Sequence, residues 1–137
     1  MKILMTLLLI IWCFVIYYLS HQTGAESLET SVKATLMIKN SLRIESVMVS
    51  NILRNSAHFI EYFILSSLFY INLRINGRKT IYGLLFVCLI SVIDELYQFF
   101  IPGRVMDFTD LMIDNLGNLL GYYITSLLYI LKTSTLS

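Results

Sequence analysis

Acidic residues gather in the stretch SVIDELYQFFIPGRVMDFTDLMIDNLGNLLGYY, which lies between two apolar runs. Three of the acids, Asp107, Asp110 and Asp114, are separated by three and then four positions. On an α-helix this spacing places them on one face, and Gly117 and Gly121 continue the same stripe. Carboxylates arranged in this way can transfer protons or hold a cation. Because a GxxxG pair allows close helix approach, we expect the acidic face to pack against a neighbouring helix rather than to face lipid.

Further polar residues also have helical spacing. His58 and Glu61 are three positions apart and share a face, whereas Asp94 and Gln98 are four apart and share another. Glu95 is turned from Asp94 by about 100°. Since imidazole and carboxyl groups are the usual general acids and bases, the candidate catalytic residues are His58, Glu61, Asp94 and Glu95. The candidate ligands for a divalent cation are Asp94, Asp110 and Asp114.

The elements that must position these residues are four long apolar runs, at 3–19, 57–73, 81–101 and 111–131. Each run has about 17–21 residues, and roughly 20 helical residues cross a hydrocarbon core of ~30 Å. With 57% apolar residues and one proline, the chain 1–137 is expected to form a single all-α domain, an integral membrane bundle of four transmembrane helices. The first run has an alternative interpretation as a signal peptide cleaved after Ala25, but its length and bulky aromatic residues favour a retained helix.

Charge is distributed unevenly between the two sides of such a bundle. The N-terminus, the loop 72–80 and the C-terminal tail contain basic residues and no acid, while every Asp and Glu falls on the other side. Short basic loops favour the cytoplasm, so we expect a multi-pass protein of the cell membrane with both termini cytoplasmic. The outer segment 20–56 mixes apolar and charged residues at helical spacing, which predicts an amphipathic helical segment that lies on the membrane surface or over the bundle. A solvated helical hairpin is the alternative.

Four alternating spans bring the polar ends of all four helices together at one membrane face. The pocket residues expected there are Gln22, Arg54, His58, Glu61, Asp94, Glu95, Gln98, Arg104, Asp107, Asp110, Asp114 and Asn115. Six of them are acids and two are arginines, which gives a formal balance of −4 with neutral histidine. One charge at mid-bilayer costs ~2.5–3.5 kcal/mol, so such residues are rare unless they are functional or paired. Some carboxyls are therefore expected to be protonated, hydrated or paired with a cation or a cationic ligand.

Structural roles compete with these functional ones. Asp107 has the residue type and position of a helix N-cap. Arg104 is placed to hold its loop by pairing with Asp107 or Asp94, and Pro102-Gly103 is typical of a turn. A purely structural network of the buried acids also remains open.

The same motifs resemble those of a known family. RNSAHFIEYFIL and DELYQFFIPGRVMDFTDLMIDNLGNLLG are similar to the H-x-x-E-Y and D-E-x-x-Q-x-x-x-P-x-R-x-x-D-x-x-D-x-x-x-(D/N)-x-x-G patterns of the VanZ-like family of small bacterial membrane proteins. YLSHQ, after the first run, resembles the S-S-Q corner of that family, with His21 where serine is usual. The namesake confers low-level resistance to teicoplanin and related lipoglycopeptides, so the resemblance implies a role in the cell envelope and in glycopeptide susceptibility. The motif positions that it covers are His58, Glu61, Tyr62, Asp94, Glu95, Gln98, Pro102, Arg104, Asp107, Asp110, Asn115 and Gly117.

Three functions remain open. The first is a non-enzymatic protein whose acid-rich outer pocket binds a lipid-linked cell-wall precursor or another amphiphilic envelope molecule such as a lipoglycopeptide. The second is a membrane-embedded enzyme that uses carboxylates, with or without a divalent cation, on a lipid-linked substrate. The third is a proton- or ion-coupled carrier, which would need homo-oligomerisation because four spans are few. The lipid bilayer is the expected partner, and nucleic acid is not, because the basic residues are not clustered with aromatic ones.

Overall fold

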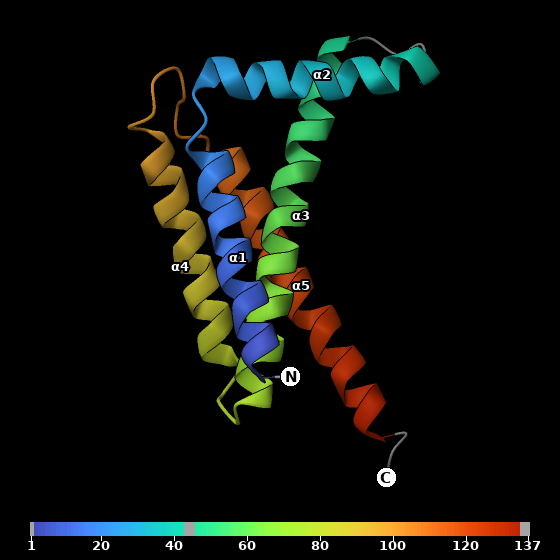
Figure 1. Ribbon diagram of the computed structural model, residues 1–137, viewed down its shortest axis with the longest axis vertical. Helices are drawn as coiled ribbons and strands as arrows, with labels where there is room; N and C mark the ends of the chain where they lie inside the picture. Colours follow the sequence, from blue (N-terminus) through green and yellow to red (C-terminus); the bar gives the residue numbers. More distant parts are fainter. Residues whose placement is uncertain (1, 43–45, 135–137) are drawn as a thin grey trace.

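The chain forms a bundle of helices that is covered at one end by a further helix. In the computed structural model, which describes residues 2–42 and 46–134, the helices are α1 (Lys2–Ser20), α2 (Gly24–Leu42), α3 (Ser46–Ile75), α4 (Ile81–Gln98) and α5 (Phe108–Ser134). Four of them run along the long axis of the molecule, whereas α2 lies across one end (Figure 1). The start of α1 and the end of α5 both lie at the opposite end. The described residues include no strand, and the predicted all-α class is confirmed.

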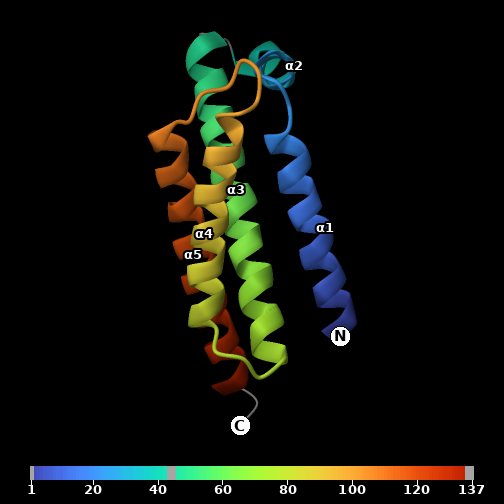
Figure 2. The ribbon, with the colours of Figure 1, turned by 90° about the vertical axis from the view of Figure 1, so that its left-hand side faces the viewer.

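Helix α3 is the centre of the bundle. It contacts each of the other four helices and packs most extensively against α5, with α1 on its other side (Figure 2). Two glycines of α5 explain the tight α3–α5 contact: a Cβ at Gly117 would lie 2.5 Å from the carbonyl oxygen of Phe59, and one at Gly121 would overlap that of Phe63. The GxxxG pair therefore brings two backbones together, as its spacing predicts.

Two of the helices, α1 and α4, are long and apolar enough to cross a membrane. Their mean hydropathies are 2.4 and 1.6. The longer helices α3 and α5 do not reach this level because polar residues interrupt their apolar sequence. The four-span bundle expected from the sequence is therefore supported by length and composition for two of its four helices.

The bundle is polar inside and apolar outside, the reverse of a water-soluble protein. Its apolar core is small and centres on Ile16, Tyr62, Leu65 and Val87. Large apolar side chains face outward along α1, α4 and α5 instead. The buried polar and charged residues include Ser20, His58, Ser66, Ser91, Glu95, Gln98, Asp110, Asp114 and Asn118. An apolar exterior of this kind suits contact with lipid.

The covering helix α2 is attached to the loop between α4 and α5. The backbone N–H of Gly24 donates to the carbonyl oxygen of Pro102 at 3.1 Å, and a Cβ at Gly24 would overlap the carbonyl oxygen of Gly103. Gly103 itself has φ of 76°, a conformation that favours glycine. The predicted Pro-Gly turn therefore also serves as the docking point for the start of α2.

Some helix boundaries differ from the predicted spans. α3 begins at Ser46 rather than at residue 57, since the polar residues before 57 continue the helix. α4 ends at Gln98 rather than at residue 101, where the chain enters the Pro-Gly turn.

Candidate functional site

An ion-pair network joins α3 to α5 just below α2. Arg54 donates to Oδ2 of Asp110 and lies 4.0 Å from Oδ2 of Asp107. One turn further along α3, Nδ1 of His58 is 3.1 Å from Oδ1 of Asp114, while its Nε2 is 3.8 Å from Oδ2 of Asp110. Residues three or four apart on α3 thus face residues three or four apart on α5, as their helical spacing predicts.

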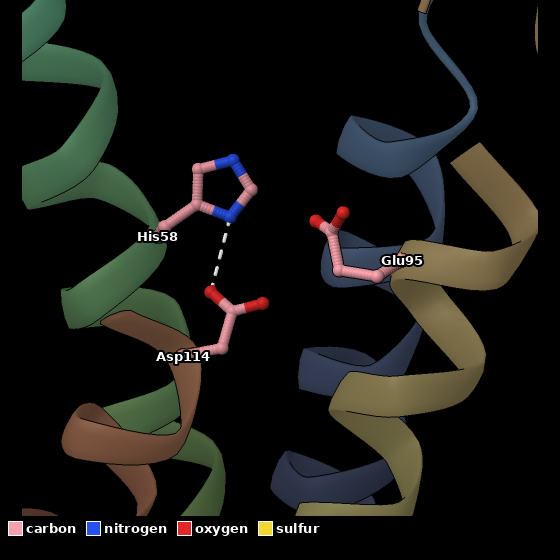
Figure 3. Close-up of side chains that lie close together, drawn as sticks. All are labelled: His58, Glu95 and Asp114. Carbon is pink, nitrogen blue, oxygen red and sulfur yellow. Dashed lines mark hydrogen bonds and ion pairs between the residues drawn. The ribbon is translucent and has the colours of Figure 1, made fainter. Parts of the chain in front are cut away.

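Helix α4 adds a carboxylate to this network from the other side. Glu95 is fully buried, and its Oε2 accepts the backbone N–H of Asp107 at 3.0 Å. Glu95, His58 and Asp114 each offer one ligand atom, and these three atoms lie within 4.8 Å of one another. Figure 3 shows the three side chains, from three different helices, around a common space. We call these residues the three-helix cluster.

Asp94, the neighbour of Glu95, has other partners. Its Oδ2 accepts hydrogen bonds from the hydroxyl of Tyr62 at 3.0 Å and from Nε2 of Gln98 at 3.3 Å. Asp94 also lines an apolar groove of about 330 Å³ between α1 and α4, which we call the α1–α4 groove. The groove is lined by Cys13, Ile16, Tyr17, Leu65, Ile90, Ile93, Asp94 and Tyr97.

A polar cavity of about 100 Å³ lies beneath α2. It is lined by Leu19, Ser20, Gln22, Ser27, Thr30, Ala57, His58, Glu61, Gln98 and Arg104. Among the described residues, the charged groups of this lining are the carboxyl group of Glu61 and the guanidinium of Arg104. The other acids of the expected acid-rich pocket are not part of this lining: Glu95, Asp110 and Asp114 are buried among the helices.

Arg104 organises the upper end of this cavity. Its Nη1 donates to the carbonyl oxygens of Ser20 at 3.2 Å and Leu19 at 3.5 Å, and its Nη2 to Oγ of Ser27 at 3.4 Å. A cation at the last carbonyls of α1 is favoured by the helix dipole. Burial lowers the pKa of the Arg104 guanidinium. These contacts replace the pairing with Asp107 or Asp94 that the sequence suggested.

A second hollow lies on the other side of Arg104. Its volume is about 280 Å³, and its charged lining residues are Arg54, Arg104 and Asp107. Asp107 begins α5 as the predicted N-cap, since its Oδ1 accepts the backbone N–H of Thr109 at 2.8 Å. That hydrogen bond lowers the pKa of the Asp107 carboxyl.

Two positions identified in the sequence have local roles. Nδ2 of Asn115 donates to the carbonyl oxygen of Leu111 at 2.8 Å, so this side chain binds its own helix. Nδ1 of His21 lies 2.6 Å from the hydroxyl of Tyr97. The next residue, Gln22, lines the polar cavity and His21 does not. The histidine that stands where the family usually has serine therefore lies outside the cavity lining.

Sequence reasoning missed the contribution of α2 and of the α1–α4 groove. Ser27 and Thr30 of α2 line the cavity at a spacing of three, which was the available signal, but helical spacing did not distinguish a helix on the membrane surface from one over the bundle. The groove residues were interpreted only as parts of apolar spans.

The sequence of this chain is similar to that of a known protein family. A family model described as VanZ/LLP1 matches residues 5–129. No curated protein and no solved structure matches the chain.

Proposed function

The chain belongs to the VanZ/LLP1 family, and from this premise we propose that it is a multi-pass protein of the cell membrane in which α1, α3, α4 and α5 all cross the bilayer. The apolar exterior of these helices supports the proposal. The start of α1 and the end of α5 also lie at the end of the bundle opposite α2, as an even number of spans requires. In this arrangement α2 lies along the outer membrane surface, and the basic termini face the cytoplasm.

The bundle binds an amphiphilic envelope molecule, with the polar head group in the cavity beneath α2 and a hydrocarbon chain in the α1–α4 groove. The observation that carries this proposal is that the two spaces adjoin. Gln98 lines the polar cavity, Asp94 lines the groove, and their side chains are hydrogen-bonded. A polar compartment beside an apolar one matches a lipid with a charged head.

The cavity lining favours a phosphate-bearing head group. Arg104 supplies a guanidinium, the group best suited to phosphate oxygens, and His58 and Gln98 supply further donors. Glu61 would then accept a hydrogen bond from a hydroxyl or amine of the head group. The family resemblance connects such a molecule to lipid-linked cell-wall precursors or lipoglycopeptides, and hence to glycopeptide susceptibility.

Binding in lipid nanodiscs tests this proposal. We expect the purified protein to bind polyprenyl pyrophosphate and to bind the matching polyprenol, which lacks the charged head, at least tenfold more weakly. Arg104→Gln should remove most of this preference, whereas Lys33→Gln on the exposed surface of α2 should leave it unchanged. Equal binding of the two lipids, or an unaltered preference in Arg104→Gln, would contradict the proposed head-group site.

A second candidate is an enzyme acting on the same class of molecule. The observation in its favour is that His58 and Glu61 both line the cavity, so a base and an acid would reach a bound head group together. If this is correct, lipid-linked substrate incubated with the protein should give a new product by mass spectrometry, and Glu61→Gln should abolish it. Unchanged substrate after prolonged incubation would leave the binding function alone.

A further inference from the structure

The three-helix cluster consists of three residues that are almost completely buried, His58, Glu95 and Asp114. Glu95 and Asp114 are both 0% exposed, and His58 is 8% exposed. Burying a carboxylate is costly unless it is paired or hydrogen-bonded. The function of the cluster therefore depends on which groups offset the free-energy cost of burying its two carboxylates.

The protein supplies only part of that compensation. One oxygen of each carboxylate is used, since Oε2 of Glu95 accepts the Asp107 N–H and Oδ1 of Asp114 contacts His58. The remaining oxygens, Oε1 of Glu95 and Oδ2 of Asp114, are buried and have no hydrogen-bond partner among the described residues. Both carboxylates reach toward the space beside the His58 ring (Figure 3). Two vacant acceptors beside one imidazole form a donor set typical of a cation site.

Nearby arginines do not neutralise this pair. Arg54 bonds to Asp110 and approaches Asp107, and Arg104 donates to the end of α1 and to α2. A divalent cation would match the two negative charges of Glu95 and Asp114 while His58 stayed neutral.

We propose that His58, Glu95 and Asp114 bind a divalent transition-metal ion, for which Zn²⁺ has the matching donor preferences. Zn²⁺ accepts imidazole nitrogen and carboxylate oxygen at about 2.0–2.2 Å, and three protein ligands leave a fourth position open. Ligand atoms 4.8 Å apart or less need side-chain movements of about an ångström to reach such distances. Mg²⁺ binds less well here, because it prefers an all-oxygen octahedral shell.

This ligand set differs from the one that the sequence suggested. Of Asp94, Asp110 and Asp114, only the last belongs to the cluster, since Asp94 is bound by Tyr62 and Gln98 and Asp110 by Arg54. His58 also lines the polar cavity, so an open coordination position would lie beside a bound head group. That consequence rests on the proposed function, whereas the metal site itself does not.

Metal binding by the full chain in detergent tests the proposal without any lipid-linked molecule. After treatment with a chelator, we expect titration calorimetry to show one Zn²⁺ bound per chain, with at least tenfold weaker binding of Mg²⁺. Glu95→Gln and Asp114→Asn should each lower the affinity for Zn²⁺. The loss should exceed the roughly 10–100-fold that follows removal of a residue that only hydrogen-bonds to a metal ligand. Glu29→Gln, which removes a carboxylate from the exposed surface of α2, should bind Zn²⁺ as the unmodified chain does.

Thermal unfolding shows whether a variant has lost the metal or the fold. Zn²⁺ should raise the unfolding midpoint of the unmodified chain and of Glu29→Gln, but not that of Glu95→Gln or Asp114→Asn. Without metal, the two cluster variants should be at least as stable as the unmodified chain, because each removes a buried charge. Cobalt offers a measurement that needs no variant: bound Co²⁺ should give visible absorption bands that Zn²⁺ abolishes. Absence of Zn²⁺ binding and of these bands, or Zn²⁺ binding that survives both cluster variants, would overturn the proposed site.

Discussion

The two halves of one face of α5 use opposite means to hold the same neighbour. In the half near α2, Asp110 and Asp114 face α3 with charge, opposite Arg54 and His58. Further along, Gly117 and Gly121 have no side chain at all, so the backbones of α5 and α3 meet. The glycine half gains close packing, which stabilises helix pairs in lipid. The acidic half carries a desolvation penalty that packing alone would avoid.

This difference indicates that stability accounts for the glycine half of α5 but not for the acidic half. Replacing a buried ion pair with apolar residues is often neutral or stabilising, so the acidic half is not the cheapest way to join α3 to α5. The unpartnered Oδ2 of Asp114 lies in that half, and the unpartnered Oε1 of Glu95 reaches the same cluster from α4. The acids are therefore explained better by a ligand or an ion than by the needs of the fold.

The largest effect is expected from breaking the glycine half. Gly117→Leu places a side chain where even a Cβ would lie 2.5 Å from the Phe59 carbonyl oxygen, so α3 and α5 must separate. We expect a loss of about 3 kcal/mol, at the upper end for overpacking, measured as chemical unfolding in detergent. Leu116→Ala, at an exposed neighbour on α5, should change stability by about 0.5 kcal/mol or less. A fully stable Gly117→Leu protein would contradict the close approach of the two backbones.

Removing Arg54, the arginine of α3 that faces the acidic half, should have the next largest effect on stability. Arg54→Ala leaves the buried Asp110 without its guanidinium partner, with only the imidazole of His58 at 3.8 Å among the described residues. Breaking a buried pair costs about 3–5 kcal/mol, but the Arg54 side chain is 42% exposed, so solvent screening reduces the expected loss to about 2 kcal/mol. Adding Asp110→Asn to Arg54→Ala should restore much of that stability. If the double variant is no more stable than Arg54→Ala, the charge on Asp110 is not what the arginine compensates.

The cap that begins the acidic half provides a smaller, pH-dependent effect. Asp107→Ala should cost about 1 kcal/mol at pH 7, a typical loss for an N-cap. The folded-state pKa of Asp107 is lowered, so its contribution is present above the unfolded pKa of about 3.9 and is lost as pH falls through the folded value. The difference between the two proteins should therefore narrow below about pH 4 in unfolding experiments followed by circular dichroism. Asp107→Asn, which keeps a capping oxygen, should be less destabilising at pH 7, and a pH-independent difference for the alanine variant would argue against an ionised cap.

The smallest effect is expected at the far end of the same helix pair. The guanidinium of Arg74 lies 5.1 Å from the ring centre of Tyr129, linking α3 to α5 outside the glycine contact. Arg74→Gln should cost about 0.5–1 kcal/mol, as for exposed cation–π contacts, in the same unfolding assay. Arg78→Gln, in the loop after α3, is the matched control and should have no measurable effect. A loss at Arg74 as large as that at Arg54 would remove the distinction between the two halves.

The periodic features of this molecule were predictable from its sequence, and the rotations of its helices were not. The step of three and four from Asp110 to Gly121 identified the buried face of α5 because helical geometry is fixed. The choice between Asp94 and Glu95 was different, since both lie in the same apolar run, 81–101. Which of them faces the centre depends on how α4 packs against its neighbours, and Glu95 is the one buried there.

Helical spacing left the position of α2 open between the membrane surface and the end of the bundle. The start of α2 has a capping box that was not among the predicted features: Oε2 of Glu26 accepts the backbone N–H of Thr23 at 2.8 Å, and Oγ1 of Thr23 accepts that of Glu26 at 3.3 Å. Its place over the bundle depends on Gly24 meeting Pro102, and nothing local encodes a contact between two segments so far apart along the chain.

The reach of Arg104 has a consequence for biosynthesis. The Arg104 side chain donates hydrogen bonds to the last carbonyl oxygens of α1, although Arg104 follows Ser20 by 84 positions in the sequence. A growing chain therefore emerges with the end of its first helix lacking these donors until the loop before α5 has left the ribosome. The corner that closes the bundle is consequently among the last parts to form, and a nascent chain halted before this loop should remain accessible to proteolysis at residues 20–24.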